Sequence, residues 1–264
     1  MNRILSKIPN SVSLAVADRV RSLERSGVQI VKLQTGDPSF PTPEPVVAAA
    51  HDAMRNGMTH YSSTRGLPEL RSAIADKLRS VNHLSYDPDQ EILVTHGGIH
   101  AVYCAINALA NPGDEVLIFD PCWMPYVSAT TIAGGRPVRI QTDPQDGFAI
   151  TAHQLEAHLT HRSRIVILNS PCNPSGHMIA PEQLREIAEI VERHNLLVIS
   201  DEVYESLTYD GHEHVSFASL PGMRDRTITI NSFSKTYAMS GWRIGYLAAC
   251  ARWTELILNL SQYS

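Results

Sequence analysis

From Glu91 onward, short apolar segments alternate with helix-like segments, and this alternation restricts the possible folds more than any other feature. The apolar segments are expected to be strands and are Ile92–Thr95, Glu115–Phe119, Ile165–Leu168, Leu196–Ser200 and Thr227–Ile230. The helical segments between them include Ile99–Ala110, Thr151–Leu159 and Pro181–His194. Short apolar strands separated by helices predict an α/β fold with three α/β/α layers and a mainly parallel sheet covered on both faces.

The residues before Glu91 have a different pattern. Apolar residues at helical spacing predict a helix over Ser11–Ser26, and Val28–Leu33 is expected to be a short strand. Residues 36–43 are too rich in proline and glycine for regular structure and are expected to form an ordered crossing between two parts of the fold. Glu44–Asn56 and Leu67–Val81 are expected to be amphipathic helices, each with a proline near its first turn.

Charge and composition exclude several classes of protein. The formal net charge is -5 and no block of basic residues occurs, so neither nucleic acid nor an anionic membrane is an expected partner. No apolar run is long enough to span a bilayer, and Met1–Asn10 lacks the core of a signal peptide. The four cysteines form no CxxC pair, which favours a cytoplasmic protein, and the twelve histidines show no metal-ligand spacing, so no metal is expected.

In a parallel sheet the ligand binds at the carboxyl ends of the strands, so the residues that follow each strand are the candidate site. Taken singly, Lys235 is more often a solvated loop lysine, Asp201 a helix cap and Asn173 a turn residue. The full set also includes the Gly97-Gly98 pair, Arg243 and Trp123. An amine, a carboxylate, an amide, a glycine-led helix start, an arginine and an aromatic ring together predict a site for a planar, phosphorylated aldehyde cofactor.

In these segments the chain resembles the class I/II aminotransferases, the fold-type I family of enzymes that use pyridoxal 5′-phosphate (PLP). The matching segments occur in family order from about Leu33 to the end of the chain. They are GDPSF at 36–40, YSSTRGLPELR at 61–71, Gly97-Gly98, NSPCNPSG at 169–176, DEVY at 201–204 and SFSKTYAMSGWRIG at 232–245. The last three are highly specific in combination.

The resemblance implies catalytic roles for Lys235, Asp201 and Tyr204. Lys235 would form a Schiff base with PLP and then move the proton at the substrate α-carbon. Asp201 would pair with the pyridine nitrogen and keep it protonated. Tyr204 and Asn173 would donate hydrogen bonds to the phenolic oxygen of the cofactor, and Trp123 would stack on its ring.

The resemblance also implies which groups bind the phosphate. Gly98 and Ile99 would offer backbone N–H groups at the start of a helix, although many relatives have a polar residue at the second position. Ser232, Ser234 and Arg243 would add side-chain donors.

Further implied contacts involve the substrate and a second subunit. Tyr61 would reach the phosphate in the neighbouring subunit, so the resemblance implies a homodimer with shared active sites. Gly36 would approach the substrate carboxylate by its backbone, and Trp123 and Asn173 would also contact the substrate. The expected substrates are an amino acid and a 2-oxo acid.

The expected organisation follows the same family. Residues 1–42 would form an N-terminal arm and part of a small domain, and residues 43–264 the PLP-binding large domain. Relatives continue for more than a hundred residues beyond this point, so the remainder of the C-terminal small domain, with the arginine that binds the substrate α-carboxylate, is expected to be absent.

The expected function is PLP-dependent transfer of an amino group between an amino acid and a 2-oxo acid. A C–S lyase on the same fold needs the same lysine and aspartate, so the motifs leave that alternative open. A PLP-binding pseudo-enzyme without turnover also remains open, because of the expected truncation. A PLP-sensing transcription regulator is disfavoured, because the family match begins within the first forty residues and leaves no room for a DNA-binding module.

Overall fold

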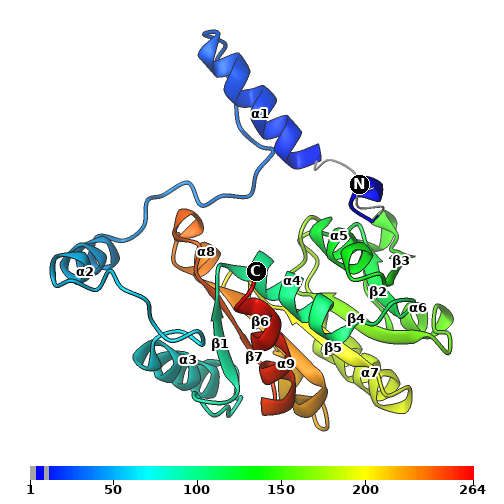
Figure 1. Ribbon diagram of the computed structural model, residues 1–264. Helices are drawn as coiled ribbons and strands as arrows, with labels where there is room; N and C mark the ends of the chain where they lie inside the picture. Colours follow the sequence, from blue (N-terminus) through cyan, green and yellow to red (C-terminus); the bar gives the residue numbers. More distant parts are fainter. Residues whose placement is uncertain (1–3, 9–11) are drawn as a thin grey trace.

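The computed structural model describes residues 4–8 and 12–264, and these residues build one seven-stranded sheet in the order β1-β7-β6-β5-β4-β2-β3 (Figure 1). The strands are β1 Ile92–Thr95, β2 Glu115–Asp120, β3 Arg136–Gln141, β4 Ser163–Asn169, β5 Leu197–Asp201, β6 Thr227–Ser232 and β7 Gly245–Ala248. The pairings from β3 through β2, β4 and β5 to β6 are parallel, whereas β7 runs antiparallel to both of its neighbours. The predicted mainly parallel sheet is therefore confirmed.

Helices cover both faces of the sheet and give the predicted three layers (Figure 1). One face packs against α4 Gly98–Leu109, α5 Pro125–Ile132 and α9 Ala251–Ser261. The other face packs against α6 Ala152–Ala157, α7 Pro181–Arg193 and α3 Pro68–Val81. The short helix α8, Phe233–Thr236, directly follows β6.

Local sequence explains where these elements form. Strand β2 is buried on both faces, so Val116 and Ile118 enter one core cluster while Leu117 and Phe119 enter the other. Helices α3 and α7 both begin with proline, whose missing N–H costs nothing in a first helical turn. Helix α6 begins with a reciprocal capping box between Thr151 and Gln154.

The N-terminal part differs from the prediction at one element. Helix α1 Val12–Arg25 matches the predicted helix, whose expected first residue, Ser11, lies outside the described residues. The strand predicted over Val28–Leu33 is wrong, because these residues form an irregular chain. Val31 and Leu33 are 83% and 88% exposed, so apolar character alone did not bring this segment beside another strand.

Helix α2 Glu44–Arg55 stands apart from the sheet, and every one of its residues is at least partly exposed (Figure 1). The loop before α2 is joined to the body through Thr42. Its hydroxyl donates to the Ala238 carbonyl at 2.6 Å and accepts from the Trp242 indole at 3.0 Å. The predicted crossing over residues 36–43 is therefore an irregular segment that meets the chain just after α8.

The two edges of the sheet end differently. Beyond β1, the backbone N–H of Val94 donates to the carbonyl of Arg65 at 3.0 Å, so residues before α3 cover part of this edge. At the other edge, β3 contains Pro137, which has no N–H, and has exposed arginines at 136 and 139. Among the described residues, no helix is both long and apolar enough to cross a membrane.

Candidate active site

The carboxyl ends of the parallel strands bring the polar residues together at one edge of the sheet. Asp120, Asn169, Asp201 and Ser232 are the last residues of β2, β4, β5 and β6. These strands are consecutive neighbours and parallel, so the segments that follow them form one continuous surface. Except for Gly36 and Tyr61, the predicted site residues lie on these segments and on the glycine turn between β1 and α4.

Asp201 is a buried carboxylate at the centre of this edge, with 5% of its surface exposed. One oxygen accepts a hydrogen bond from the Tyr126 hydroxyl at 2.6 Å, and the other accepts from the Val203 backbone N–H at 3.3 Å. Burial raises the pKa of Asp201 to about 6 from an ordinary 3.8, although the bonds from Tyr126 and Val203 act in the opposite direction. A buried carboxylate in this setting gains most from a cationic partner.

The loop after β4 orients Asn173 and Tyr204. The Asn169 side chain donates to the Asp201 carbonyl at 3.0 Å and accepts from the Asn173 backbone N–H at 2.8 Å. The Asn173 amide in turn donates to the Tyr204 hydroxyl at 3.3 Å. Burial, followed by the nearby Asp201 charge, raises the pKa of Tyr204. The structure thus brings three predicted residues, 173, 201 and 204, into one hydrogen-bonded group.

Lys235 lies on α8, immediately beyond β6, and its ammonium group donates to the carbonyl of Gly36. Burial is the main reason that the pKa of Lys235 is lowered, and the positive charge of Arg243 acts in the same direction. The carboxylate of Asp37 opposes both effects. A lysine with a lowered pKa is more often present as the neutral amine, which is the nucleophilic form.

Arg243 lies against the start of α4. Gly97, at φ +81°, precedes this helix in a backbone conformation that L side chains rarely adopt, and a Cβ added there would lie 2.5 Å from Nη2 of Arg243. Among the described residues, no side chain caps this helix start. Backbone N–H groups and a guanidinium therefore point to an anion site.

Gly98 and Gly245 allow the surrounding backbone to approach closely. A Cβ on Gly98 would lie 3.2 Å from Val203 and 3.7 Å from Ser232. A Cβ on Gly245 would lie within 2.9 Å of backbone atoms of residues 97, 98 and 231. The start of α4 is therefore continuous with the ends of β5 and β6. Arg243 and Val203 thus lie against the two glycines of this turn, and the Val203 N–H in turn donates to Asp201.

The remaining predicted phosphate ligands have local roles as well. The Ser232 hydroxyl accepts from the Ser234 backbone N–H at 3.1 Å, which caps α8, and donates to the Ile244 carbonyl at 3.2 Å. Ile99, the second residue of α4, is 46% exposed, and because its side chain is apolar only its backbone N–H can donate to an anion.

Two predicted aromatic residues differ in their surroundings. Trp123 is partly buried and contacts Tyr126 edge-to-face, with 5.3 Å between ring centroids. Tyr61 is fully exposed on the segment between α2 and α3, so within one chain the structure does not bring it to the other site residues.

A cavity of about 510 Å³ lies beside the Lys235 helix. Its walls come from the irregular crossing and from the segment between α8 and Arg243; the lining residues are Asp37, Pro38, Phe40, Pro41, Thr42, Ala238, Ser240, Gly241 and Trp242. Gly36 and Asp37 also contact or face Lys235, so this cavity opens beside the predicted lysine.

Sequence reasoning missed several functional candidates. Tyr126 donates to Asp201 from a residue 75 positions earlier in the chain, and no local pattern signals such a partner. Asn169 was visible as the first residue of the NSPCNPSG segment but was not assigned its orienting role. The Asp37 carboxylate beside Lys235 and the contact between Gly97 and Arg243 also emerge only in three dimensions.

Comparison with known proteins identifies consistent relatives. A family model described as aminotransferase class I and II matches residues 28–263. The bifunctional aspartate aminotransferase and glutamate/aspartate-prephenate aminotransferase of Petunia hybrida is 46% identical over 92% of this chain, and the aspartate aminotransferase of Musicola paradisiaca is 38% identical over 98%. The solved structure of Thermus thermophilus aspartate aminotransferase with maleate superposes on the whole chain with a TM-score of 0.96 at 36% identity.

The match covers only part of each relative. This chain corresponds to 51% of the Petunia protein, 65% of the Musicola protein and 68% of the Thermus structure. It therefore spans about half to two thirds of the length of the relatives that it matches.

Proposed function

Because the chain belongs to the class I and II aminotransferases, a PLP-dependent family, we propose that its protein transfers an amino group between an amino acid and a 2-oxo acid. When bound, PLP supplies a carbonyl group for the substrate amine and a ring that withdraws electrons from the substrate α-carbon. The protein residues supply binding, orientation and proton movement.

The residues at the carboxyl edge fit this cofactor. The Asp201 carboxylate, whose pKa burial raises to about 6, gains a partner in a protonated pyridine nitrogen. The start of α4 and the Arg243 guanidinium together offer the donors that a phosphate dianion requires. In this proposal Gly98, Ile99, Ser232 and Ser234 complete the phosphate contacts.

Catalysis in this proposal rests on Lys235, Asp201 and Tyr204. The lowered pKa of Lys235 leaves a larger share of its amine neutral, so Nζ can bind the cofactor and later accept the proton of the substrate α-carbon. Asp201 would hold a proton on the pyridine nitrogen, and Tyr204 and Asn173 would donate to the phenolic oxygen. Asn169 orients Asn173, which is hydrogen-bonded to Tyr204. Trp123 stacks on the ring and, with Asn173 and Gly36, contacts the substrate.

One observation carries this proposal. A buried carboxylate, an amine with a lowered pKa and an uncapped helix start with an adjacent guanidinium all lie on the same strand ends. The buried carboxylate favours a cationic group of the ligand, and the helix start with its guanidinium favours an anionic group. A neutral amine on the same strand ends can react with a carbonyl of that ligand.

Covalent trapping tests the proposed lysine. The chain has four lysines, Lys7, Lys32, Lys77 and Lys235. After equilibration with PLP, borohydride reduction and peptide mass mapping, we expect the cofactor on Lys235 alone. Lys235→Ala should abolish the attachment while the control Lys32→Ala, at an exposed ion pair with Glu24, retains it. Attachment at another lysine would contradict the assignment.

Turnover assays separate transamination from elimination. We expect the PLP-loaded chain to convert an amino acid and 2-oxoglutarate into the paired 2-oxo acid and glutamate. Several relatives are named aspartate aminotransferases, so aspartate is the first amino acid to assay. Release of pyruvate and ammonia from cystathionine without a 2-oxo acid would instead identify a C–S lyase.

We also propose a homodimer with shared active sites, in which Tyr61 contacts the phosphate bound by the other subunit. The support is the set of exposed large side chains between residues 31 and 61: Val31, Leu33, Phe40, Met54, Met58 and Tyr61. Sedimentation velocity of the chain measures its mass directly, and a monomer at all concentrations would contradict this part of the proposal.

The domain organisation of the chain and its cellular compartment are also proposals. We propose that residues 1–42 form an arm and part of a small domain, and that residues 43–264 form the large domain. The separation of α1 from the sheet supports the first unit (Figure 1). The four cysteines, all of them free, support a cytoplasmic protein.

A further inference from the structure

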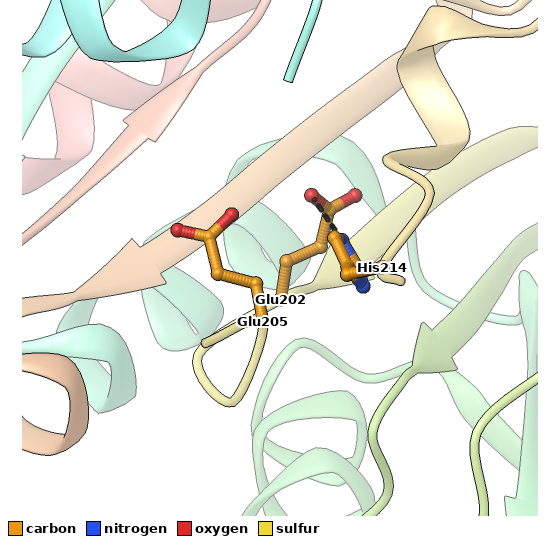
Figure 2. A group of neighbouring side chains, drawn as sticks. All are labelled: Glu202, Glu205 and His214. Carbon is orange, nitrogen blue, oxygen red and sulfur yellow. Dashed lines mark hydrogen bonds and ion pairs between the residues drawn. The ribbon is translucent and has the colours of Figure 1, made fainter. Parts of the chain in front are cut away.

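A second group of charged residues, Glu202, Glu205 and His214, lies on the chain that follows β5 (Figure 2). Glu202 is 1% exposed, and one of its oxygens faces Nε2 of His214 at 3.1 Å. Its other oxygen accepts from the hydroxyls of Ser200 at 2.7 Å and Ser216 at 3.0 Å, and from the Phe217 N–H at 3.2 Å. A carboxylate held by four donors has a single orientation.

Glu205 is also buried and has its own partners. Its carboxylate pairs with the ammonium of Lys77 on α3 and accepts from the Asn82 amide at 2.7 Å. Ligand atoms of Glu202, Glu205 and His214 lie within 4.8 Å of one another. All four carboxylate oxygens already have donors, and Lys77 supplies a positive charge, so the group is a charge network and leaves no open position for a metal ion.

The positions of these residues in the sequence link the network to the cofactor site. Glu202 directly follows Asp201, and Glu205 directly follows Tyr204. Asp201 accepts a hydrogen bond from Tyr126, and Tyr204 accepts one from Asn173. Glu202 and Glu205 instead face α3 and the segment at 214–217. Asp201 and Tyr204 thus each precede a glutamate whose side chain is held by a different set of partners.

We propose that Lys77, Glu202, Glu205 and His214, here called the Glu202 network, position Asp201 and Tyr204 and set the charge that Asp201 experiences. The inference rests on the proposed function, because it concerns the same cofactor site. These four are positioning residues, since none of them lies among the groups assigned to the cofactor.

The charges of Glu202 and His214 are opposite in sign, and that of Glu202 acts on Asp201. The negative charge of Glu202 raises the pKa of Asp201, after the larger effect of burial. Burial alone lowers the pKa of His214, but its hydrogen bond and ion pair with Glu202 outweigh burial and raise it. His214 is therefore positively charged over a wider pH range and offsets Glu202. Other groups facing the pair are Glu205, Lys77 and the buried hydroxyls of Tyr86 and Tyr246.

Two substitutions that retain hydrogen-bonding shape but remove one charge test the proposal. The affinity of the 264-residue chain for PLP is to be measured against pH by quenching of tryptophan fluorescence. The quantity compared is the midpoint, the pH at which the affinity has half fallen as the pH is lowered. Glu202→Gln removes a negative charge beside Asp201 and should move the midpoint to lower pH. His214→Gln leaves Glu202 uncompensated and should move it to higher pH, each shift being about one pH unit.

Glu115→Gln is the matched control. Glu115 is also 1% exposed and has three side-chain donors, Arg136, Thr160 and Ser163. It is the first residue of β2 and so lies at the amino ends of the strands, opposite the candidate site. We expect it to lose thermal stability without moving the midpoint.

The direction of the two shifts distinguishes the possible results. Shifts of the two midpoints in opposite directions support the proposal. Shifts in the same direction, or midpoints equal to that of Glu115→Gln, would indicate a general structural effect and overturn the proposal. If one variant fails to fold by circular dichroism, the direction of the other decides. If the wild-type chain binds no PLP at Lys235, the proposed function itself is contradicted. If PLP binds normally but the midpoints of the variants do not shift, only the role of the Glu202 network is contradicted.

Discussion

Asp201 combines two properties that usually exclude each other, deep burial and an ionisable carboxylate. Its hydrogen bonds come from a neutral phenol and a backbone N–H, neither of which compensates a full negative charge. The raised pKa is the result, and it is a property of the protein before any cofactor binds. A pyridinium partner would restore the charged form, so cofactor binding and ionisation of this one residue are coupled.

We expect the affinity of the chain for PLP to fall as the pH drops through about 6, the pKa of Asp201. Below that pH the carboxyl is protonated and cannot pair with a protonated ring nitrogen. Asp201→Asn should remove this acid limb and weaken binding at pH 8 by about ten- to a hundredfold, since a charge-assisted hydrogen bond contributes about 1.5–3 kcal/mol. Fluorescence titration between pH 5 and pH 8, with values taken at about half-unit steps, measures both effects.

The same substitution has a predictable effect on folding. The folded-state pKa of Asp201 is raised, so its ionised form opposes folding above about pH 6 and this penalty disappears at lower pH. Asp201→Asn should therefore leave the thermal midpoint of the cofactor-free chain at pH 8 unchanged or higher. A large loss of stability would instead support a purely structural capping role for the carboxylate.

At the scale of the element, the turn between β1 and α4 packs against β6 and β7, and glycines make this close packing possible. Gly97 adopts a left-handed conformation, and Gly245 leaves room for the backbone of the turn to lie against the start of β7. The anion site proposed at α4 depends on this contact, because Arg243 reaches the turn from the chain just before Gly245. A methyl group at 245 has no flexible side chain to displace, only backbone.

Gly245→Ala should therefore destabilise the chain by about 1–3 kcal/mol, the usual range for forcing extra atoms into a packed region. It should also weaken PLP binding, because the α4 start moves relative to Arg243. Gly241→Ala is the control, since a Cβ there meets nothing within 4 Å and this glycine has no positive φ. Urea unfolding of the three chains compares their free energies, and equal values would show that the turn can shift freely.

Elements with strong local patterns could be predicted from the sequence, and those without could not. β1 was predicted with its observed bounds, because ILVT is a short run of apolar and β-branched residues directly before the glycine turn. β3 was missed, since an edge strand with two exposed arginines and a proline lacks an apolar pattern. β7 was missed as well, because it has only four residues and begins with glycine. The false strand at 28–33 had the opposite problem, an apolar pattern without a neighbouring strand.

The candidate site shows the same division. Residues on specific motifs, among them Asp201, Asn173, Tyr204 and Arg243, lie on adjoining segments of one edge, as strand order requires. The Tyr126 hydroxyl and the Asp37 carboxylate were missed because their positions depend on packing between distant segments. The Glu202 network was invisible for the same reason, since its members come from α3 and from the chain between β5 and β6.

At the scale of the whole molecule, the packing is uneven. The sheet and its two helical layers contain the buried clusters, whereas α1, α2 and the segments around them are mostly exposed (Figure 1). The arm meets the body at few points, chiefly Thr42 with Ala238 and Trp242, and Gly36 with Lys235. Such a segment opens locally at little cost in free energy.

Limited trypsin digestion should therefore cut first after Arg25, Lys32 and Arg55, all of which are exposed, and leave a resistant fragment that begins at Asn56. Arg71, 6% exposed and hydrogen-bonded to Gly66, Pro88 and Asp89, should be protected. Mass spectrometry of timed samples gives the order of the cuts. Early cleavage inside the sheet, for example after Arg164 in β4, would contradict this division.

The two borders of the sheet determine how copies of this chain can associate. On the β1 side a neighbouring segment already occupies a backbone donor, and on the β3 side proline and like charges disfavour an incoming strand. Lateral growth into a continuous intermolecular ribbon is thereby blocked at both ends. Two protomers would therefore associate through side-chain surfaces, such as the exposed residues of α2, and not by adding strands to the sheet.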